Sequence, residues 1–245
     1  PNQQTYFSFA QANREPNRTD YEAGNPKPEK LNDFELGWKL DEDKLKINVN
    51  AYYMRYKNQL ILTGAMNDVG APIRENSGDS YRMGIEIDGA VAFTKQFIWS
   101  PSITLSSNKN IDFVSHINGS LQNLGNTNIA FSPNLIASNA FTFLPTENMS
   151  VSLLTKFVGE QFMGNTDSDF SKLDSYITND IHFNYEVKTN KWFQSINFNV
   201  MLNNIFNVKY ISNGYYYTYD DTWSTQGVTT TIEGAGYYPQ AQFNI

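Results

Sequence analysis

The sequence predicts an all-β fold, an antiparallel transmembrane β-barrel to which this chain of 245 residues contributes about ten strands. Three observations lead to this prediction. Apolar and polar residues alternate with a period of two, the alternating segments are long, and short connections between them alternate with long ones. Helices and closed barrels are the two structures that satisfy all backbone polar groups in a bilayer, and alternation is the signature of the barrel.

Alternation is clearest between residues 83 and 93. There Ile85 and Ile87 alternate with Glu86 and Asp88, and acids cannot face the same medium as large apolar side chains. We therefore expect a lipid-facing set made of Ile47, Val49, Ile85, Ile87, Phe198, Val200 and Leu202. The expected lumen-facing set is Asn48, Asn50, Glu86, Asp88, Asn197 and Asn199.

Taken in chain order, the alternating segments give ten strands. They cover residues 4–12, 30–40, 44–58, 81–94, 98–108, 133–144, 149–161, 174–188, 194–206 and 236–245. Many have ten or more residues. Strands of globular proteins usually have about 5–6 residues, whereas strands that cross a bilayer need about 9–11, so strand length also favours a membrane.

The connections between these strands alternate in length. The short ones lie at 41–43, 95–96, 145–147 and 189–191, and the long ones lie at 13–29, 59–80, 109–132, 162–173 and 207–235. In an up-and-down antiparallel sheet every second connection lies at the same end. The pattern is typical of outer-membrane barrels, which have short periplasmic turns and longer extracellular loops.

Aromatic residues are expected near both ends of the strands, where the membrane interfaces would lie. Those beside the short turns are Trp38, Phe97, Trp99, Trp192 and Phe193, and those beside the second long connection are Tyr53, Tyr56 and Tyr81. Any single one of them is equally well explained by the strand preference of aromatic residues.

Composition excludes several classes of protein. The chain has 18 Lys and Arg against 25 Asp and Glu, a net charge of −7, which argues against binding to nucleic acid. The absence of Cys excludes disulfide scaffolds and thiolate metal sites. No apolar run approaches the roughly 20 residues of a transmembrane helix. The start at Pro1, without Met or a signal peptide, suggests a mature product or a piece of a longer protein.

The sequence predicts no catalytic residue, no metal site and no cofactor. Its two histidines, His116 and His182, are far apart, and neither has a second ligand at metal spacing. The sequence also has no glycine-rich phosphate-binding loop before a helix. An enzyme is therefore not expected.

Candidate ligand-binding residues lie in the long connections, because binding residues concentrate on loops held by a rigid scaffold. The 207–235 connection holds Tyr215, Tyr216, Tyr217 and Trp223, with Tyr219, Asp220 and Asp221 beside them. These rings are expected to stack on a planar or ring-shaped solute. The alternative is that they pack the connection against its neighbours.

Four arginines form a second candidate group. Arg14, Arg18, Arg74 and Arg82 lie in or near long connections and would clamp an anionic ligand through their forked donors. The alternative is pairing with nearby acids, namely Glu15, Asp20, Glu75 and Asp79. Arg82 shares the parity of Glu86 and Asp88, which predicts that it points into the lumen.

Several segments resemble TonB-dependent outer-membrane receptors. The sharpest is Val-Met-Leu-Asn-Asn-Ile-Phe-Asn-Val-Lys-Tyr at 200–210, which resembles the signature of their penultimate strand. An aromatic strand and a turn at 6–21, followed by Pro-Glu-Lys-Leu-Asn-Asp-Phe-Glu-Leu-Gly at 28–37, are similar to the middle of the barrel. Residues 67–70 and 80–86 look like later parts of it. The resemblance covers essentially the whole chain.

This resemblance implies a barrel of about 22 strands around a plug, with residues 1–245 as the C-terminal segment of the barrel domain and the plug outside this chain. It implies an outer-membrane active transporter of a Gram-negative bacterium, with extracellular long loops. The expected solute is an iron-siderophore, haem or cobalamin. The expected partners are outer-membrane lipid, the rest of the barrel, the plug and, through the plug, the TonB energy-transducing complex.

Two alternatives stay open at this stage. One is a glycan or peptide importer of the same family, working with a surface lipoprotein. The other is a small outer-membrane barrel enzyme, a protease or lipase, which would need a His paired with an acid or a Ser at the extracellular rim. Pairing of the first strand with the tenth strand would favour the small closed barrel, and open edges would favour part of a larger one.

Overall fold

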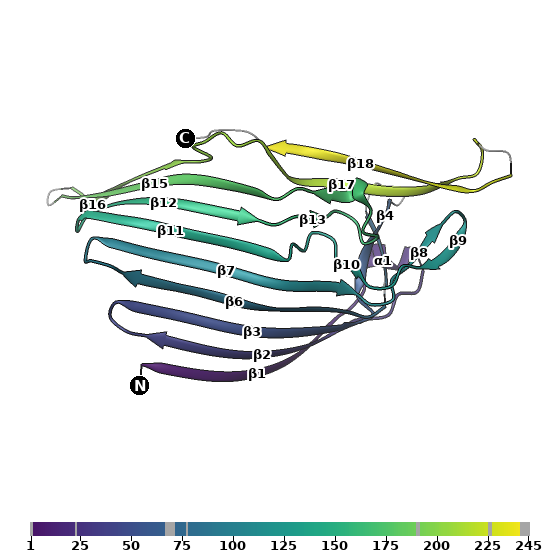
Figure 1. Ribbon diagram of the computed structural model, residues 1–245, viewed down its shortest axis with the longest axis horizontal. Coiled ribbons are helices and arrows are strands. Elements are labelled where there is room, and N and C mark those ends of the chain that lie inside the picture. Colours follow the sequence, from purple (N-terminus) through teal and green to yellow (C-terminus); the bar gives the residue numbers. More distant parts are fainter. Residues whose placement is uncertain are drawn as a thin grey trace.

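A computed structural model describes residues 2–22, 24–66, 72–76, 78–189, 192–224 and 227–240. Its main element is one curved antiparallel sheet (Figure 1). The 67–70 motif, the end of the last expected strand at 241–245 and part of the 189–191 turn lie outside the described residues. Among the described residues, no helix has the length and apolar character needed to cross a membrane.

Nine long strands follow one another across this sheet, each antiparallel to its neighbours. They are β1 (Gln3–Arg14), β2 (Glu29–Asp41), β3 (Leu45–Lys57), β6 (Ser80–Ala92), β7 (Phe97–Asn110), β11 (Leu135–Thr146), β12 (Met149–Val158), β15 (Tyr176–Lys188) and β16 (Ser195–Leu202). The short β10 (Thr127–Asn128) adds to the end of β7. These nine strands confirm the first nine that the alternation predicts.

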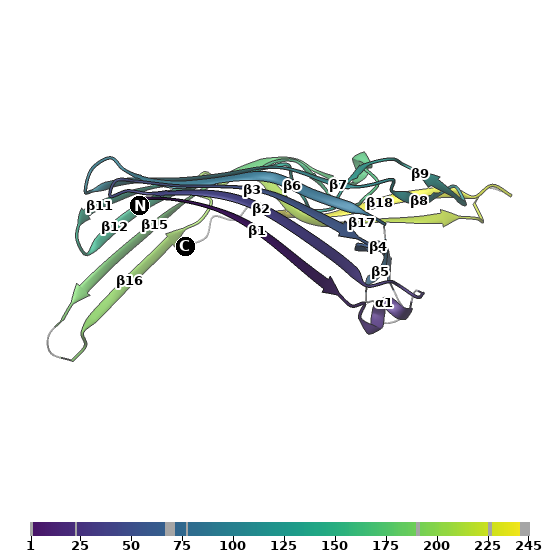
Figure 2. The same ribbon diagram turned by 90° about the horizontal axis from the view of Figure 1, so that it is seen from below.

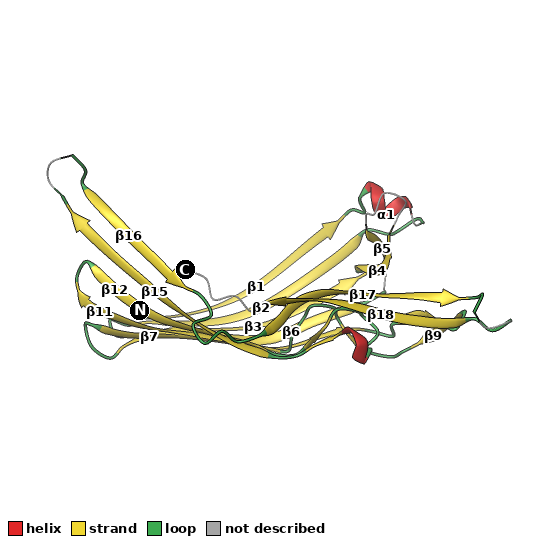
Figure 3. Ribbon diagram, turned by 90° about the horizontal axis from the view of Figure 1, so that it is seen from above, coloured by secondary structure: helices red, strands yellow, loops and turns green. Residues whose placement is uncertain are grey.

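The sheet is open in the described part of the chain. Strand β1 pairs with β2 and β16 pairs with β15, so β1 and β16 form its two edges. Figures 2 and 3 show that both edge strands bend to the same side, as in a segment of a barrel wall. The described strands therefore do not close into a small barrel of their own.

Register separates an apolar face from a polar face. Val49 pairs with Ile87, and Ile87 pairs with Ile103, while the neighbouring row joins Asn50, Glu86 and Thr104. All members of the expected lipid-facing set fall on the apolar face, and all members of the expected lumen-facing set fall on the polar face. This partition confirms the alternation predicted from the sequence.

Between β1 and β16, connection length also follows the prediction. The four short turns after β2, β6, β11 and β15 lie at one end of the sheet, and the long connections gather at the other (Figure 1). Rings stack near the short turns, where Phe97 and Trp99 each lie 6.0 Å from Phe141. At the opposite end Tyr53 stacks on Tyr81 at 6.4 Å.

The long connections are themselves partly structured. They contain α1 (Arg18–Glu22), the η1 turn (Asp169–Ser171) and the strand pairs β4–β5 (Leu60–Met66, Pro72–Asn76), β8–β9 (Val114–Ile117, Ser120–Asn123) and β13–β14 (Gln161–Phe162, Lys172–Leu173). The buried apolar side chains gather there too, namely Leu60, Phe113, Ile129, Val158, Met163 and Leu173. The compact core of the described residues therefore lies under the long connections.

The expected loop over 207–235 is wrong. Strand β17 (Tyr210–Asp221) pairs with β18 (Thr230–Gln240) as a long hairpin, so the last strand begins at Thr230 instead of residue 236. Tyr215, Tyr217 and Tyr219 alternate with their neighbours in exposure, as strand residues do. Tyrosine is suited to both solvent-exposed and buried faces. A segment made almost wholly of tyrosines therefore shows no apolar–polar alternation in its sequence.

Glycines let tyrosine rings lie against the polar face of the sheet. Gly37 pairs with Tyr6 and Gly84 with Tyr52, and a Cβ atom on either glycine would come within 3.0 Å of the tyrosine ring. At Gly84 it would also meet the carbonyl oxygen of Leu105 at 2.5 Å. Position 84 therefore requires glycine because backbone approaches it closely, whereas a side chain at position 37 would displace the Tyr6 ring.

Candidate functional site

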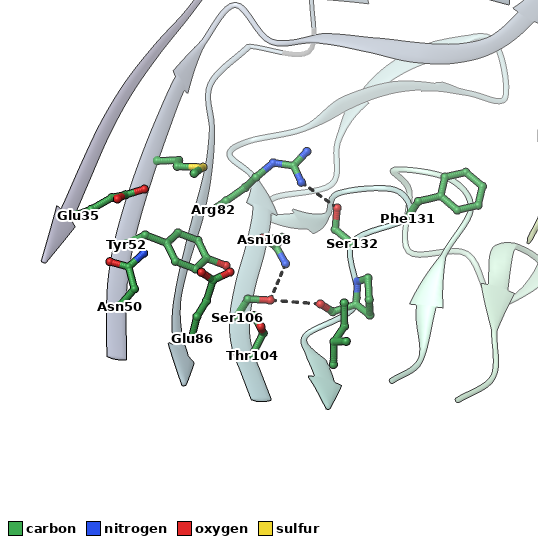
Figure 4. Close-up of a pocket in the computed structure, with 13 residues that line it drawn as sticks. Glu35, Asn50, Tyr52, Arg82, Glu86, Thr104, Ser106, Asn108, Phe131 and Ser132 are labelled. Carbon is green, nitrogen blue, oxygen red and sulfur yellow. Dashed lines mark hydrogen bonds between the residues drawn. The ribbon is translucent and has the colours of Figure 1, made fainter. Parts of the chain in front are cut away.

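One candidate site is a pocket on the polar face of the sheet (Figure 4). Strands β2, β3, β6 and β7 supply most of its wall, and the segment 131–133 closes one side. Its polar lining consists of Glu35, Asn50, Tyr52, Arg82, Glu86, Thr104, Ser106, Asn108 and Ser132. The alternation predicts that Asn50 and Glu86 face the lumen. It does not predict that their strands are neighbours, which depends on the strand register.

Arg82 is the central cation of this pocket. Its Nη1 donates to Ser132 Oγ at 3.1 Å, and its guanidinium lies 5.8 Å from the ring centroid of Tyr56. Its buried Nε has no hydrogen-bond partner within the described residues. Arg82 and Glu86 lie on the same face, as predicted. The guanidinium therefore brings a positive charge to the polar face, while its Nε is buried away from a solute.

Below Arg82 a short chain of hydrogen bonds holds the wall. Asn108 Nδ2 donates to Ser106 Oγ at 3.0 Å, and Ser106 Oγ donates to the carbonyl oxygen of Pro133 at 3.2 Å. These bonds fix the 131–133 segment against β7 (Figure 4). The pocket can accept polar groups, because Asn50 and Ser106 supply amide and hydroxyl contacts beside the cation of Arg82 and the carboxylates of Glu35 and Glu86.

The other three arginines lie apart from this pocket. Arg74, on β5, pairs with Asp20 at 3.6 Å, and the Asp20 side chain is fully buried. Arg74 therefore pairs with a nearby acid, which was the alternative to binding an anionic ligand. Arg14, at the end of β1, and Arg18, at the start of α1, are exposed and form no ion pair with the described residues. Of the four candidate arginines, Arg82 is the one that lines the pocket.

The second candidate site lies on one face of the β17–β18 hairpin. There Tyr215, Tyr217, Tyr219 and Trp223 form a row that we call the aromatic platform. Successive ring centroids are 6.3, 6.4 and 6.4 Å apart, with interplanar angles of 19°, 12° and 11°. Tyr238 continues the row at 6.1 Å from Tyr215 with a tilt of 50°. The platform rings therefore share nearly one orientation.

Tyr216 lies on the opposite face of the hairpin. Its hydroxyl donates to Glu233 Oε1 at 2.9 Å and lies 3.2 Å from Thr166 Oγ1. Burial, the largest cause, raises the pKa of the Tyr216 phenol above its ordinary value. Tyr216 therefore packs against neighbouring residues, which was the alternative to ligand binding. Tyr215, Tyr217 and Trp223 remain together on the exposed face.

Sequence reasoning missed Tyr238 and the two glycines under the platform. Gly236 pairs with Tyr215 and Gly234 with Tyr217, and each tyrosine ring would lie 2.4 Å from a Cβ on its glycine. The signal that would have found them is cross-strand pairing of aromatic residues with glycines. That signal becomes readable only after the register of the hairpin is known.

Side chains connect the long connections into one layer. The amide of Asn118 donates to Thr231 Oγ1 at 2.6 Å, and Asn118 Oδ1 accepts from the amide of Thr231 at 2.9 Å. Asn165 Oδ1 accepts from Ala130 N at 3.0 Å and Asn110 Nδ2 at 3.2 Å. In the described part of the chain, no three His or acidic side chains gather at metal-binding distance.

Comparisons with known proteins agree with this geometry. A family model described as TonB dependent receptor-like, beta-barrel, matches residues 1–208. The search of curated proteins found no match. The chain is similar to the solved siderophore receptor PiuA of Acinetobacter baumannii, with 16% identity and a TM-score of 0.66 over 96% of this chain and 32% of that one.

Two further solved structures are similar. The ferric yersiniabactin uptake receptor FyuA of Yersinia pestis has 15% identity and a TM-score of 0.61, over 96% of this chain and 33% of that one. The copper transporter OprC has 18% identity and a TM-score of 0.66, over 97% of this chain and 36% of that one. The chain thus spans about a third of the length of these structures, and such low identities establish the fold alone.

Proposed function

Since this chain belongs to the TonB dependent receptor-like β-barrel family, we propose that it forms the C-terminal part of an outer-membrane transporter. The complete receptor binds a scarce solute at the side of the long connections and imports it. The remainder of the barrel closes the wall beside β1 and β16, and a plug fills the lumen. Energy comes through the plug from the TonB complex.

The observation that carries this proposal is the separation of the two faces over nine strands. Ile85, Ile87, Ile103 and Leu105 leave at least 36% of their surface exposed on one face, an arrangement that suits lipid. The other face presents Asn50, Glu86 and their neighbours, as the lumen of a transporter does. The long connections then lie outside the cell and the short turns face the periplasm.

We infer that the solute is an iron-siderophore, haem or cobalamin. The pocket around Arg82 supports a polar cargo, because amide, hydroxyl and charged side chains line it. The names of the similar structures, two for siderophore uptake and one for copper transport, support a metal-bearing solute. No catalytic step is needed, because transport changes no covalent bond of the solute.

Uptake by whole cells tests this function. A strain lacking the full-length gene is compared with its complemented strain for uptake of a labelled ferric catecholate siderophore, haemin and cyanocobalamin, each offered alone. We expect uptake of one compound to fall at least about tenfold and to return on complementation, and dissipation of the proton gradient to abolish it. Equal uptake of all three by both strains would contradict the proposal.

A further inference from the structure

The aromatic platform has the geometry of a flat binding surface. Tyr215 and Tyr217 rest on Gly236 and Gly234 of the partner strand, so one side of each ring covers backbone. The opposite side is open, since Tyr215, Tyr217 and Tyr219 are 50%, 41% and 46% exposed. Trp223 extends the row at the hairpin tip and is 74% exposed.

The direction of the row distinguishes it from an interfacial girdle. A girdle places aromatic residues of many strands at one depth in the membrane. The platform instead runs along a single strand, and Tyr215 to Tyr219 covers about 13 Å at roughly 3.3 Å per residue. Figure 1 shows the hairpin at the end where the long connections gather, reaching past the strands of the sheet. A lengthwise row suits an extended ligand.

The described platform face carries one charged side chain, and its carboxylate oxygens are already hydrogen-bonded within the hairpin tip. Its carboxylate, Asp221, accepts hydrogen bonds from the amides of Trp223 and Ser224, both at 3.0 Å, and from the Ser224 hydroxyl. Asp220 and Glu233 lie on the other face, where they accept from Thr231 and from Tyr216. A phosphorylated or otherwise anionic ligand would need basic groups, and the described platform face has none.

Hydroxyl groups complete the site. The phenol oxygens of Tyr215, Tyr217 and Tyr219 form no hydrogen bond with the described residues, so they remain available to a ligand. A chain of pyranose rings has the matching chemistry, because each sugar presents an apolar C–H face to an aromatic ring and hydroxyls at its edge. An acyl chain would leave these phenols unused.

From these observations we propose that the aromatic platform binds a neutral, linear glycan laid along β17. The rings of Tyr215, Tyr217 and Tyr219 stack on successive sugars, and their hydroxyls bond to sugar hydroxyls. Trp223 covers the end of the glycan at the hairpin tip. This binding surface is separate from the polar pocket around Arg82, so it goes beyond the transport of the solute.

Calorimetric titration of the purified full-length receptor tests the proposal, with cellohexaose and mannohexaose as probes. We expect at least one probe to bind, and Tyr217→Ala with Tyr219→Ala to weaken binding at least about tenfold, since two neighbouring stacking surfaces are lost. Tyr216→Phe is the matched control on the opposite face and should bind as the unmodified receptor does. Heat-modifiable gel mobility checks that each variant is folded.

A second variant tests the geometry without removing a ring. Gly234→Ala places a methyl group where the Tyr217 ring now lies and should lift that ring out of the row, again weakening binding. Absence of binding to both probes, or equal binding by folded Tyr217→Ala/Tyr219→Ala receptor, would overturn the proposal. Quenching of Trp223 fluorescence by brominated lipid in vesicles would also overturn it, because the platform would then face the bilayer.

Discussion

At the scale of single residues, the ion pair of Arg74 with Asp20 connects α1 to β5. Asp20 is 1% exposed, and its Oδ2 also accepts from the amide of Asn17 at 2.8 Å. Arg74→Gln would leave a buried carboxylate without its cation, which costs about 1–3 kcal/mol locally. We expect faster tryptic cleavage after Arg18 in this variant. Arg14→Gln, at an exposed and unpaired site, should leave the cleavage rate unchanged, and equal rates in both variants would contradict the assignment.

Asp221 gives the hairpin tip a defined pH dependence. The hydroxyl of Ser224, followed by the amides of Trp223 and Ser224, lowers the pKa of the Asp221 carboxyl below its usual 3.8. A lowered pKa in the folded state means that these bonds stabilise the tip above the unfolded pKa and are lost as the pH falls through the folded pKa.

The 19F signal of a fluorotryptophan at Trp223 can follow this transition. We expect the signal to stay constant from pH 8 to about 4 and to shift below that. In Asp221→Asn the acid transition should disappear, because the amide does not titrate. A transition of the unmodified protein between pH 5 and 7 would contradict the role of Asp221.

At the scale of elements, Ile87 and Glu86 of β6 give a matched test of which face meets lipid. Ile87→Arg would place a guanidinium on the apolar face, which costs about 2–4 kcal/mol near the bilayer midplane. Glu86→Arg would place the same group on the polar face, where water and polar side chains receive it. We expect Ile87→Arg to reduce the folded, heat-modifiable receptor in outer membranes and Glu86→Arg to preserve it. The reverse result would invert the assignment of faces.

The close approach at Gly84 predicts a stability effect. Alanine there would bring a Cβ within 2.5 Å of the carbonyl oxygen of Leu105, so the β6–β7 ladder must shift, at a cost of about 1–3 kcal/mol. Urea unfolding in detergent micelles measures this cost. Gly24→Ala is the control, because no atom lies within 4 Å of its new Cβ. Equal stability of both variants would show that the sheet tolerates the methyl group.

The same elements show how far sequence can predict structure. Strands such as β6 are readable because Ile85 and Glu86 cannot exchange faces without burying a charge in lipid. The β17–β18 hairpin is not readable in that way, because tyrosines next to one another carry no apolar or polar contrast. Contacts such as Arg82 with Ser132 depend on how the segment before β11 packs against β6, and no local pattern specifies that packing.

At the scale of the whole molecule, the sheet and the layer of long connections differ in how they are stabilised. The strands of the sheet are joined by backbone hydrogen bonds and expose apolar side chains. The bilayer would cover these side chains, and the rest of a barrel would pair with the open edges. The long connections instead bury Leu173 and Met163 and interlock through polar side chains such as Asn165. Both candidate sites adjoin this layer, the polar pocket through the 131–133 segment and the β17–β18 hairpin through the contact of Tyr216 with Thr166.

The contact of Asn118 with Thr231 couples two hairpins within that layer, β8–β9 and β17–β18. Asn118 has a φ of 53°, so Asn118→Gly removes the side-chain acceptor without straining the backbone. Loss of one hydrogen bond costs about 1 kcal/mol, so we expect the amide of Thr231 to exchange with deuterium about fivefold faster in the full-length receptor. Because the two hairpins support each other, protection should also fall across β8 and β9.

Gln122→Ala, which removes a weaker bond of 3.4 Å inside β8–β9, should leave the exchange rate of the Thr231 amide unchanged. If Asn118→Gly leaves both hairpins as protected as before, the long connections act as independent loops, and the platform is held by β17 and β18 alone.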